Sequence, residues 1–293
     1  MQQRHLTEMA APAAVETPSG KSAGTENFPV GSFLLPAPLR PHVAAFYAFA
    51  RAIDDIADNP ALPAVEKISR LEGFAAALTG KDALPGFEKA ALLRESLAAT
   101  NVTPRHGLDL IEAFKLDAVK LRYADWNDLI EGYCMLSAAP VGRYLLDLHG
   151  ESTDGYPASD ALCNALQVLN HLQDCQDDYK QLNRVYLPQD WLAAAEAGVD
   201  ELSRSAASPG LRRVIDRCLD GTDALIAVAR TLPGRLRNAR LTMESAVIVR
   251  IAEKLSALLR RRDPLAGRVK LSRAAFVGCG LYGVCRGLFV ARQ

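Results

Sequence analysis

The chain has 293 residues, of which 49% are hydrophobic and 23% charged, so it is long enough to bury a sizeable core. Its 34 Lys and Arg residues equal its 34 Asp and Glu residues, which leaves no net charge to attract nucleic acid. No uncharged apolar run reaches about 18 residues, so we expect no membrane-spanning helix.

The first 25 residues are rich in Ala, Pro, Thr, Ser and Gly, and they lack the continuous apolar run of a secretory signal. We expect residues 1–25 to form a disordered lead, residues 26–270 one domain, and residues 271–293 an apolar tail. The six cysteines show no metal-binding spacing and lie in apolar or helical surroundings, as free thiols do in a reducing cytosol. The sequence therefore predicts a cytoplasmic protein.

Residues 26–270 predict helix almost throughout. Ala and Leu are frequent, alternation of β-branched residues is rare, and apolar residues recur at spacings of three and four. No strand, repeat or long linker is expected, which favours a single all-α domain. Gly, Pro and polar clusters predict loops at residues 59–63, 79–86, 101–104, 149–159, 208–210, 232–235 and 261–268.

The first predicted helix carries a polar stripe. Because a helix advances 100° per residue, Tyr47, Arg51, Asp54 and Asp58 fall on one narrow face, while apolar residues cover the other sides. Asp54 and Asp58 are one turn apart, so their like charges repel. A Mg²⁺ ion, which binds few carboxylates together with phosphate oxygens, would resolve that conflict. The alternative is a solvated acidic helix end.

The next charged segment, residues 114–133, is interpreted as a helix with a mainly solvated face that includes Asp117. Residues 137–143 (SAAPVGR) follow, and the small side chains there suit either a cavity wall for a long apolar substrate or tight helix packing. Pro140 should kink this helix. Arg143 is expected to bind diphosphate or to anchor Asp147, and Ser137 or Tyr133 to hold a water molecule.

A second acidic segment lies near residue 174. Asp174 and Asp178 repeat the one-turn spacing, Asn170 precedes them by one turn, and Asp177 adds another carboxylate. Two such segments could meet across a helical cavity and hold Mg²⁺ ions with one diphosphate. Basic side chains that could neutralise that leaving group are Arg51, Lys180 and Arg184. His171 is interpreted as a packing residue.

Four stretches together resemble the squalene/phytoene synthase family, the head-to-head class I isoprenoid synthases, over roughly residues 26–270. They are ENFPVGSFLLP (26–36), FYAFARAIDDIAD (46–58), YCMLSAAPVGRYLLDLHG (133–150) and LNHLQDCQDDYKQLNRVYLPQD (169–190). The sequences of the first and third stretches resemble the bacterial hydroxysqualene synthase branch, which belongs to hopanoid and squalene biosynthesis. The resemblance implies a single-domain helical bundle around a central cavity.

The resemblance also implies residue roles. Metal binding is implied for Asp54, Asp58, Asp174 and Asp178, although Asp177 beside Asp178 departs from the usual pattern and leaves open which of the two binds. Diphosphate contacts are implied for Tyr47 and Arg51, and the catalytic residues are expected to be Tyr133, which lies near the carbocation, Arg51 and Tyr47. Asn27 and Phe28 match the start of the flap over the site.

The implied function is Mg²⁺-dependent conversion of presqualene diphosphate to hydroxysqualene with release of diphosphate. Alternatives within the family are condensation of two farnesyl diphosphates to presqualene diphosphate or squalene, and phytoene synthesis. A catalytically inactive, membrane-associated helical scaffold is the non-enzyme alternative, and retention of all four motif aspartates argues against it. The tail either packs on the domain or contacts a membrane, which would place the protein peripherally on the inner face of the cytoplasmic membrane.

Overall fold

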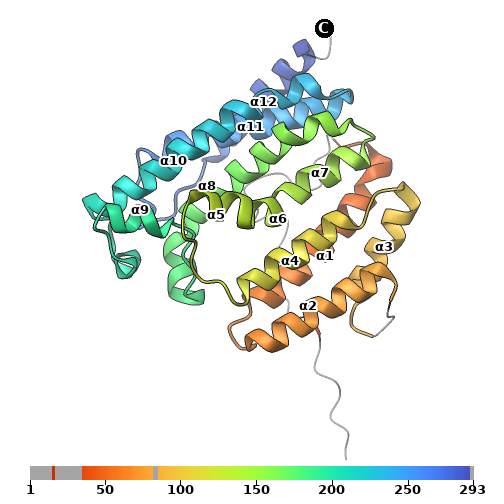
Figure 1. Ribbon diagram of the computed structural model, residues 1–293. Coiled ribbons are helices and arrows are strands. Elements are labelled where there is room, and N and C mark those ends of the chain that lie inside the picture. The colour runs from red at the N-terminus through yellow and green to blue at the C-terminus, as the bar shows by residue number, and fades with distance from the viewer. Residues whose placement is uncertain (1–14, 17–34, 82–84, 291–293) are drawn as a thin grey trace, which may run out of the picture.

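Helices make up almost all of the regular structure in this protein (Figure 1). A computed structural model describes residues 15–16, 35–81 and 85–290. Within these ranges no strand occurs, and one isolated bridge joins Arg122 to Val185. The prediction of an all-α fold is therefore confirmed. The predicted lead lies largely outside the described residues.

The first half of the fold contains the helices that surround the first acidic segment. They are the short η2 (Ala37–Leu39), α1 (Arg40–Asp58), α2 (Ala64–Thr79), α3 (Glu88–Thr100), α4 (Arg105–Asp117), α5 (Trp126–Leu129), the π-helical turn η3 (Ile130–Cys134), α6 (Met135–Ser137) and α7 (Ala139–Leu148). The second half contains η4 (Thr153–Gly155), α8 (Tyr156–Leu182), α9 (Gln189–Ala194), η5 (Val199–Ser203), α10 (Pro209–Ala229), η6 (Leu232–Arg235), α11 (Ala239–Leu259) and α12 (Arg273–Val290).

Two apolar clusters form the core. One lies among α1, α2, α3, α4 and α7, where Phe49 packs edge-on against Phe74. The other surrounds α8, which packs against α7, α10 and α11 and joins the two halves of the bundle (Figure 1). Complete burial of Phe49, Ile53 and Ile56 fixes the rotation of α1. Each such side chain contributes about 1.5–3 kcal/mol, and their burial turns the polar stripe of α1 toward α8.

The predicted loops at residues 59–63 and 101–104 are confirmed, since α1 ends at Asp58, α2 begins at Ala64 and α4 begins at Arg105. The predicted loop at 232–235 is instead a 3₁₀ turn, and α8 begins at Tyr156, inside the predicted loop 149–159. Pro157 lies in the first turn of α8, where its missing N–H breaks no helical hydrogen bond.

The predicted helix over residues 114–133 is wrong, because α4 ends at Asp117 and α5 begins only at Trp126. The intervening segment pairs with the chain that follows α8: the Val185 N–H donates to the Leu121 carbonyl at 3.0 Å. The Asp125 carboxylate then caps α5 by accepting from the Asp128 N–H at 2.8 Å. Pairing with this distant segment of the same chain therefore prevails over local helix propensity.

Pro140 does not kink a continuous helix either. The helix is interrupted at Ala138, and Pro140 lies in the first turn of α7. There the proline costs no hydrogen bond. The π-helical turn η3 just before this interruption adds a second departure from regular α-helix in the same short stretch.

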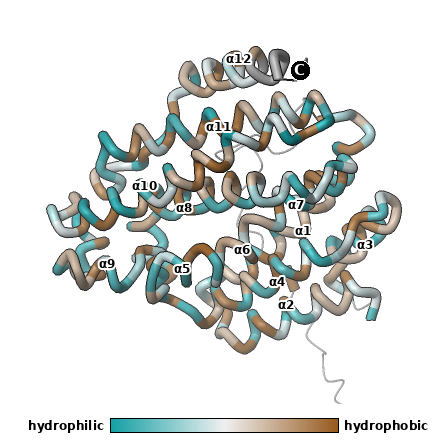
Figure 2. Tube along the Cα trace, turned by 45° about the horizontal axis from the view of Figure 1, so that its top comes forward, coloured by the Kyte–Doolittle hydropathy of each residue, from teal (hydrophilic) through white to brown (hydrophobic). Residues whose placement is uncertain are grey.

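The apolar tail forms α12, which lies along the outer side of α11 (Figures 1 and 2). Cys279 of α12 is buried against Val247 and Ile251 of α11. A Cβ atom on Gly283 would lie 2.5 Å from the Val247 backbone, so glycine permits the close approach of the two helices. Packing of the tail on the domain is therefore observed, and no helix in the described ranges is long and apolar enough to cross a membrane.

Candidate active site

A cavity of about 270 Å³ lies between α1, α7, α8 and α11. Most of its wall is apolar, with Phe46 and Tyr144 stacked at a ring-centroid distance of 3.9 Å. Five residues predicted to form the site contribute polar groups to the wall: Tyr47, Arg51, Asp54, Ser137 and Asn170. The cavity can thus enclose a hydrocarbon chain while one side presents charged groups.

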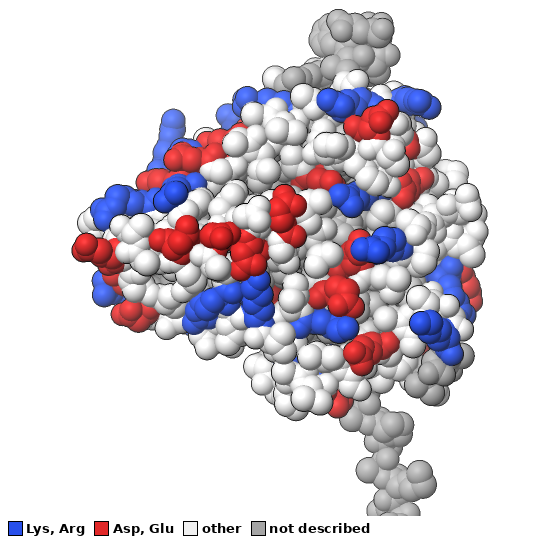
Figure 3. Space-filling view, viewed as in Figure 1, with Lys and Arg blue, Asp and Glu red and all other residues white. Residues whose placement is uncertain are grey.

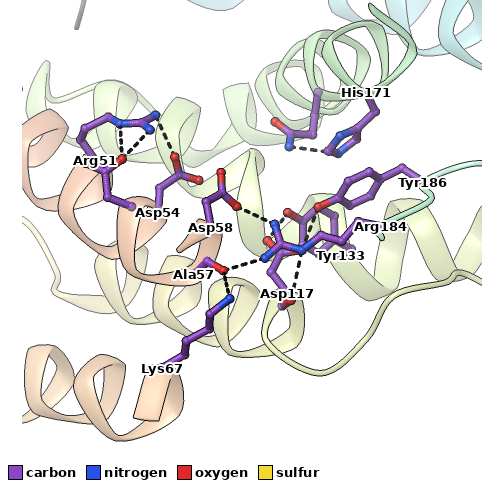
Figure 4. A network of polar contacts seen from close by, with 12 residues as sticks. Arg51, Asp54, Ala57, Asp58, Lys67, Asp117, Tyr133, His171, Arg184 and Tyr186 are labelled. Atoms are coloured by element: carbon purple, nitrogen blue, oxygen red, sulfur yellow. Dashed lines mark hydrogen bonds and ion pairs between the residues drawn. The ribbon is translucent and has the colours of Figure 1, made fainter. Parts of the chain in front are cut away.

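The two motif aspartates of α1 pair with different arginines. Arg51 donates to Asp54, with Nη1 2.7 Å from Oδ2, and to Asp55, with Nη2 2.7 Å from Oδ1. Asp58, one turn after Asp54, contacts a different arginine: Nη1 of Arg184 lies 2.6 Å from its Oδ1 (Figure 4). Three of the four stripe residues therefore line the cavity, and the fourth, Asp58, lies in a partly buried ion pair.

Arg184 is 5% exposed, and its donors are directed at protein acceptors. Besides Asp58, its Nη2 donates to the Ala57 carbonyl at 2.8 Å and its Nε to the Asp117 carbonyl at 3.1 Å. Lys67 donates to the same Ala57 carbonyl at 2.7 Å. Burial, followed by the charge of Arg184, lowers the pKa of Lys67. Two cations from α2 and from the chain after α8 thus contact the last turn of α1.

The sequence prediction for Asp117 is wrong, because this carboxylate is 4% exposed rather than solvated. It accepts the Tyr133 hydroxyl at 2.7 Å and the Tyr186 hydroxyl at 2.9 Å (Figure 4). Burial raises the pKa of Asp117 to about 6, against the opposing effect of the nearby Arg184 charge. The position at the end of α4, where the chain turns inward, explains the burial.

The second acidic segment lies on α8. Burial, followed by the negative charges of Asp174 and Asp58, raises the pKa of Asp178 to about 8. The charge of Asp58 on α1 therefore acts on Asp178 of α8, and joint metal binding by the two segments remains a prediction. Arg268 lies near this segment, with Nη2 3.6 Å from Asp174 Oδ1.

These residues fit a Mg²⁺ site completed by substrate. In the described part of the chain, no three His, Cys, Asp or Glu side chains converge on one point. Mg²⁺ commonly uses only one or two carboxylates together with phosphate oxygens, so such convergence is not required. Burial, and after it the charges of Asp174 and Asp58, raise the pKa of Asp178, and a divalent cation would stabilise the ionised carboxylate against both.

The other predicted site residues are placed as follows. Asp177 and Lys180 are exposed on α8, whereas Asp178 is half-buried, which favours Asp178 as the ligand. Arg143 does not anchor Asp147; it forms a bidentate pair with Asp160 at 2.7 and 2.8 Å. Diphosphate binding by Lys180 and Arg143 remains a prediction.

Asp147 instead accepts from His106 and Tyr156. Tyr133 is 2% exposed and absent from the cavity wall, so its expected position near the carbocation remains a prediction. The His171 ring stacks on Tyr186 at a centroid distance of 3.5 Å, as expected of a packing residue. Asn27 and Phe28 lie outside the described residues.

Sequence reasoning missed Lys67 and Asp117 as parts of the site. Lys67 lies in a helix with no acidic motif, and the sequence around Asp117 has the charge pattern of a solvated surface. Tyr186 lies in the stretch 169–190, where no local pattern marks it as a site residue. Only the tertiary fold brings these three residues to Arg184.

An apolar cavity in a helical bundle, lined by Asp54 of α1 and by Asn170 of α8, which also carries the second acidic segment, is the arrangement of the isoprenoid synthase class of enzymes. Residues 22–275 match the model of the family described as squalene/phytoene synthase, and the chain belongs to that family. Enzymes of this family act on isoprenoid diphosphates and generally depend on a divalent metal.

Sequence and structural similarity to other proteins extends over most of the chain. The hydroxysqualene synthase of Rhodopseudomonas palustris is 44% identical over 265 residues, which are 90% of this chain and 90% of that protein. The hydroxysqualene synthase of Zymomonas mobilis is 41% identical over 273 residues, 92% of this chain and 91% of that protein. The crystal structure of squalene synthase HpnC from Alicyclobacillus acidocaldarius has a TM-score of 0.70 at 33% identity, covering 82% of this chain and 90% of that one.

Proposed function

We propose that this enzyme converts presqualene diphosphate to hydroxysqualene and releases diphosphate, with Mg²⁺ as cofactor, in squalene and hopanoid biosynthesis. The observation that carries the proposal is the apolar cavity whose wall includes Tyr47, Arg51 and Asp54 of the first acidic segment. The charge of Asp58 on the same helix raises the pKa of Asp178 on α8, which supports a site shared by the two segments. The two hydroxysqualene synthases that match over 90% or more of this chain support the choice of product.

The chemistry begins with cleavage of the bond between carbon and the diphosphate oxygen, and the electron pair leaves with the oxygen. When bound, Mg²⁺ supplies positive charge to that leaving group. Asp54, Asp58, Asp174 and Asp178 would hold the metal, and Arg51 lines the cavity where it can contact the diphosphate. The apolar walls keep bulk water from the carbocation while it rearranges and a bond of its cyclopropane ring breaks. Capture of the resulting cation by one water, followed by loss of a proton from that water, gives the open-chain alcohol.

Ser137 is the residue that the structure favours for holding the capturing water. It belongs to the cavity wall, and its buried hydroxyl has no hydrogen-bond partner in the described structure. The Tyr133 hydroxyl is already donated to Asp117. Replacing Ser137 with Ala should therefore shift product from alcohol toward hydrocarbon, whereas Tyr133→Phe should leave the product ratio unchanged. The opposite result would indicate that the Tyr133 hydroxyl holds the water.

Product analysis tests the proposed reaction. Purified enzyme with Mg²⁺ receives presqualene diphosphate or farnesyl diphosphate, with and without NADPH, in ¹⁸O-water. We expect presqualene diphosphate to give hydroxysqualene with one labelled oxygen, independently of NADPH. Squalene formed only with NADPH, or an unlabelled alcohol, would contradict the proposal. Presqualene diphosphate formed from farnesyl diphosphate would assign the condensation step instead.

The enzyme is proposed to act as a peripheral protein on the inner face of the cytoplasmic membrane. Residues 264–293 contain five Lys or Arg and no Asp or Glu, although the whole chain is neutral and both signs intermix on the face in Figure 3. On α12, Val277 is 60% and Leu281 67% exposed. An apolar face beside basic residues suits an anionic lipid surface, where an apolar product would leave.

Co-sedimentation with vesicles tests this location. We expect binding to vesicles with phosphatidylglycerol and weak binding to pure phosphatidylcholine. Val277→Ser with Leu281→Ser should reduce binding. The matched control is Leu92→Ser, since Leu92 is 58% exposed on α3. Equal binding by the α12 variant and the control would exclude this surface, and self-association through α12 would point to a second copy of the chain instead.

A further inference from the structure

The last turn of α1 is held by two buried cations. Lys67 Nζ and Arg184 Nη2 donate to one acceptor, the Ala57 carbonyl, at 2.7 and 2.8 Å (Figure 4). Lys67 is 9% exposed and Arg184 5% exposed. Arg184 also donates to Asp58 Oδ1 at 2.6 Å. The backbone and the carboxylate at this end of the helix are therefore fixed by the same guanidinium.

Arg184 is itself fixed from the opposite side by Asp117. Its Nε donates to the Asp117 main-chain carbonyl at 3.1 Å and lies 4.0 Å from Asp117 Oδ1. The hydroxyls of Tyr133 and Tyr186 donate to the two carboxylate oxygens of Asp117. The two tyrosines thus hold the Asp117 carboxylate by hydrogen bonds. That carboxylate lies at ion-pair distance from Arg184, which in turn donates to Asp58.

The charges in this network balance. Lys67 and Arg184 provide two positive charges, and Asp58 and Asp117 provide two negative ones. Removing one member of a buried set leaves an uncompensated charge, which the surroundings can accommodate only by moving other groups. The orientation of Asp58 should therefore depend on residues that lie far from the cavity wall.

We propose that Asp117 and Lys67 are positioning residues that orient Asp58 for metal binding, acting through Arg184 and the Ala57 carbonyl. The inference rests on the proposed function, because it requires Asp58 to bind Mg²⁺. With Oδ1 held by Arg184, a cation would be bound through Oδ2. Groups that orient a ligating carboxylate change metal affinity when they are removed, although they never touch the metal.

The test compares Asp117→Asn with the wild-type enzyme in two measurements. The first is the Mg²⁺ concentration that gives half-maximal activity, which we expect to rise at least about tenfold, the lower end for lost outer-shell partners. The activity at saturating Mg²⁺ should fall much less. The second is the rise in melting temperature caused by Mg²⁺ with inorganic diphosphate, which should shrink in the variant.

Asp109→Asn is the matched control. Asp109 lies on the same helix, α4, is also buried, and also pairs with an arginine, Arg105, at 2.6 Å. This variant should lower the melting temperature without changing the Mg²⁺ requirement. At the other cation, Lys67→Met should raise the Mg²⁺ concentration needed for half-maximal activity. Lys67→Arg keeps the charge and hydrogen-bond donors, so its Mg²⁺ requirement should stay close to that of the wild-type enzyme.

A purely structural role for Asp117 predicts a different outcome. In that case Asp117→Asn lowers the melting temperature, yet keeps the wild-type Mg²⁺ requirement and ligand-induced shift, and the inference is overturned. An equal change in Asp109→Asn would overturn it as well. Should Asp117→Asn fail to fold, Tyr186→Phe carries the same test with a smaller expected change. If the wild-type enzyme itself shows no shift with Mg²⁺ and diphosphate, the proposed metal site fails first.

Discussion

The two acidic segments have the same spacing but different electrostatic surroundings. On α1, each motif aspartate contacts an arginine, since Asp54 pairs with Arg51 and Asp58 with Arg184. On α8, burial and neighbouring carboxylates hold the pKa of Asp178 near 8. Arginines of the protein thus contact both motif aspartates of the first segment. In the second segment the pKa of Asp178 stays raised, although Arg268 lies 3.6 Å from Asp174. A sequence motif alone does not specify this difference.

The largest expected effect is on the stability of the protein, at the ion pairs of the first acidic segment. Replacing Arg184 with Met leaves the buried Asp117 and the partly exposed Asp58 without their shared cation, which should cost about 3–5 kcal/mol of stability. Arg51→Met, at a 17% exposed and partly solvated pair, should cost about 1 kcal/mol or less. Urea unfolding of both variants measures the contrast. Equal losses would mean that the two α1 pairs are energetically alike.

The next effect concerns catalysis on the α8 side. We expect Asp178→Asn to lower the rate of diphosphate release at least about 10²-fold, as loss of a preorganised electrostatic group does. The melting temperature should stay level or rise, because a source of like-charge repulsion is removed. Near-normal turnover of this variant at saturating Mg²⁺ would remove Asp178 from the metal site.

The pH dependence of stability should differ between the two segments. Because the folded-state pKa of Asp178 is about 8, against 3.8 in the unfolded chain, the folded state binds more protons between these values. Its stability should therefore fall as pH rises toward 8, by up to about 1.4 kcal/mol per pH unit. Melting curves in EDTA from pH 6 to 9 measure this fall.

Mg²⁺ with diphosphate should reverse that loss, because the cation replaces the proton. Asp178→Asn serves as the control, since an amide cannot titrate, and its melting temperature should change less across the same pH range. A wild-type curve that matches the variant in EDTA would contradict the unusual pKa of Asp178.

The smallest expected effect is at Asp177, the extra carboxylate of the second segment. Asp177 is exposed on α8, so Asp177→Asn should change stability by less than about 0.5 kcal/mol and activity by less than a few-fold. Activity and melting assays in parallel with Asp178→Asn measure the difference. Comparable losses for the two variants would show that the adjacent pair shares the metal.

Helical periodicity was sufficient to predict the local part of the site. It placed Tyr47, Arg51 and Asp54 on one face of α1, and the cavity contains all three. It could not reveal that Asp58 pairs with Arg184, because those residues are 126 positions apart and meet only in the tertiary fold.

Charge patterning was misleading where the backbone departs from regular helix. Asp117 shares its charge-rich neighbourhood with Lys120 and Asp128, yet it is buried whereas those two are partly exposed. The difference arises because α4 ends at Asp117 and the following chain pairs with residues after α8. Such a turn depends on a distant segment, and no window of the sequence around Asp117 contains that information.

The separation of Asp58 and Arg184 has a consequence for how the site forms during synthesis. Ribosomes add about 5–20 residues per second, so the 126 residues between them take about 6–25 s to emerge. Lys67, only ten residues after Ala57, can bond its carbonyl almost at once. The nascent chain can therefore complete the helical packing around α1 well before Arg184 exists, and the catalytic geometry is set among the last events of folding.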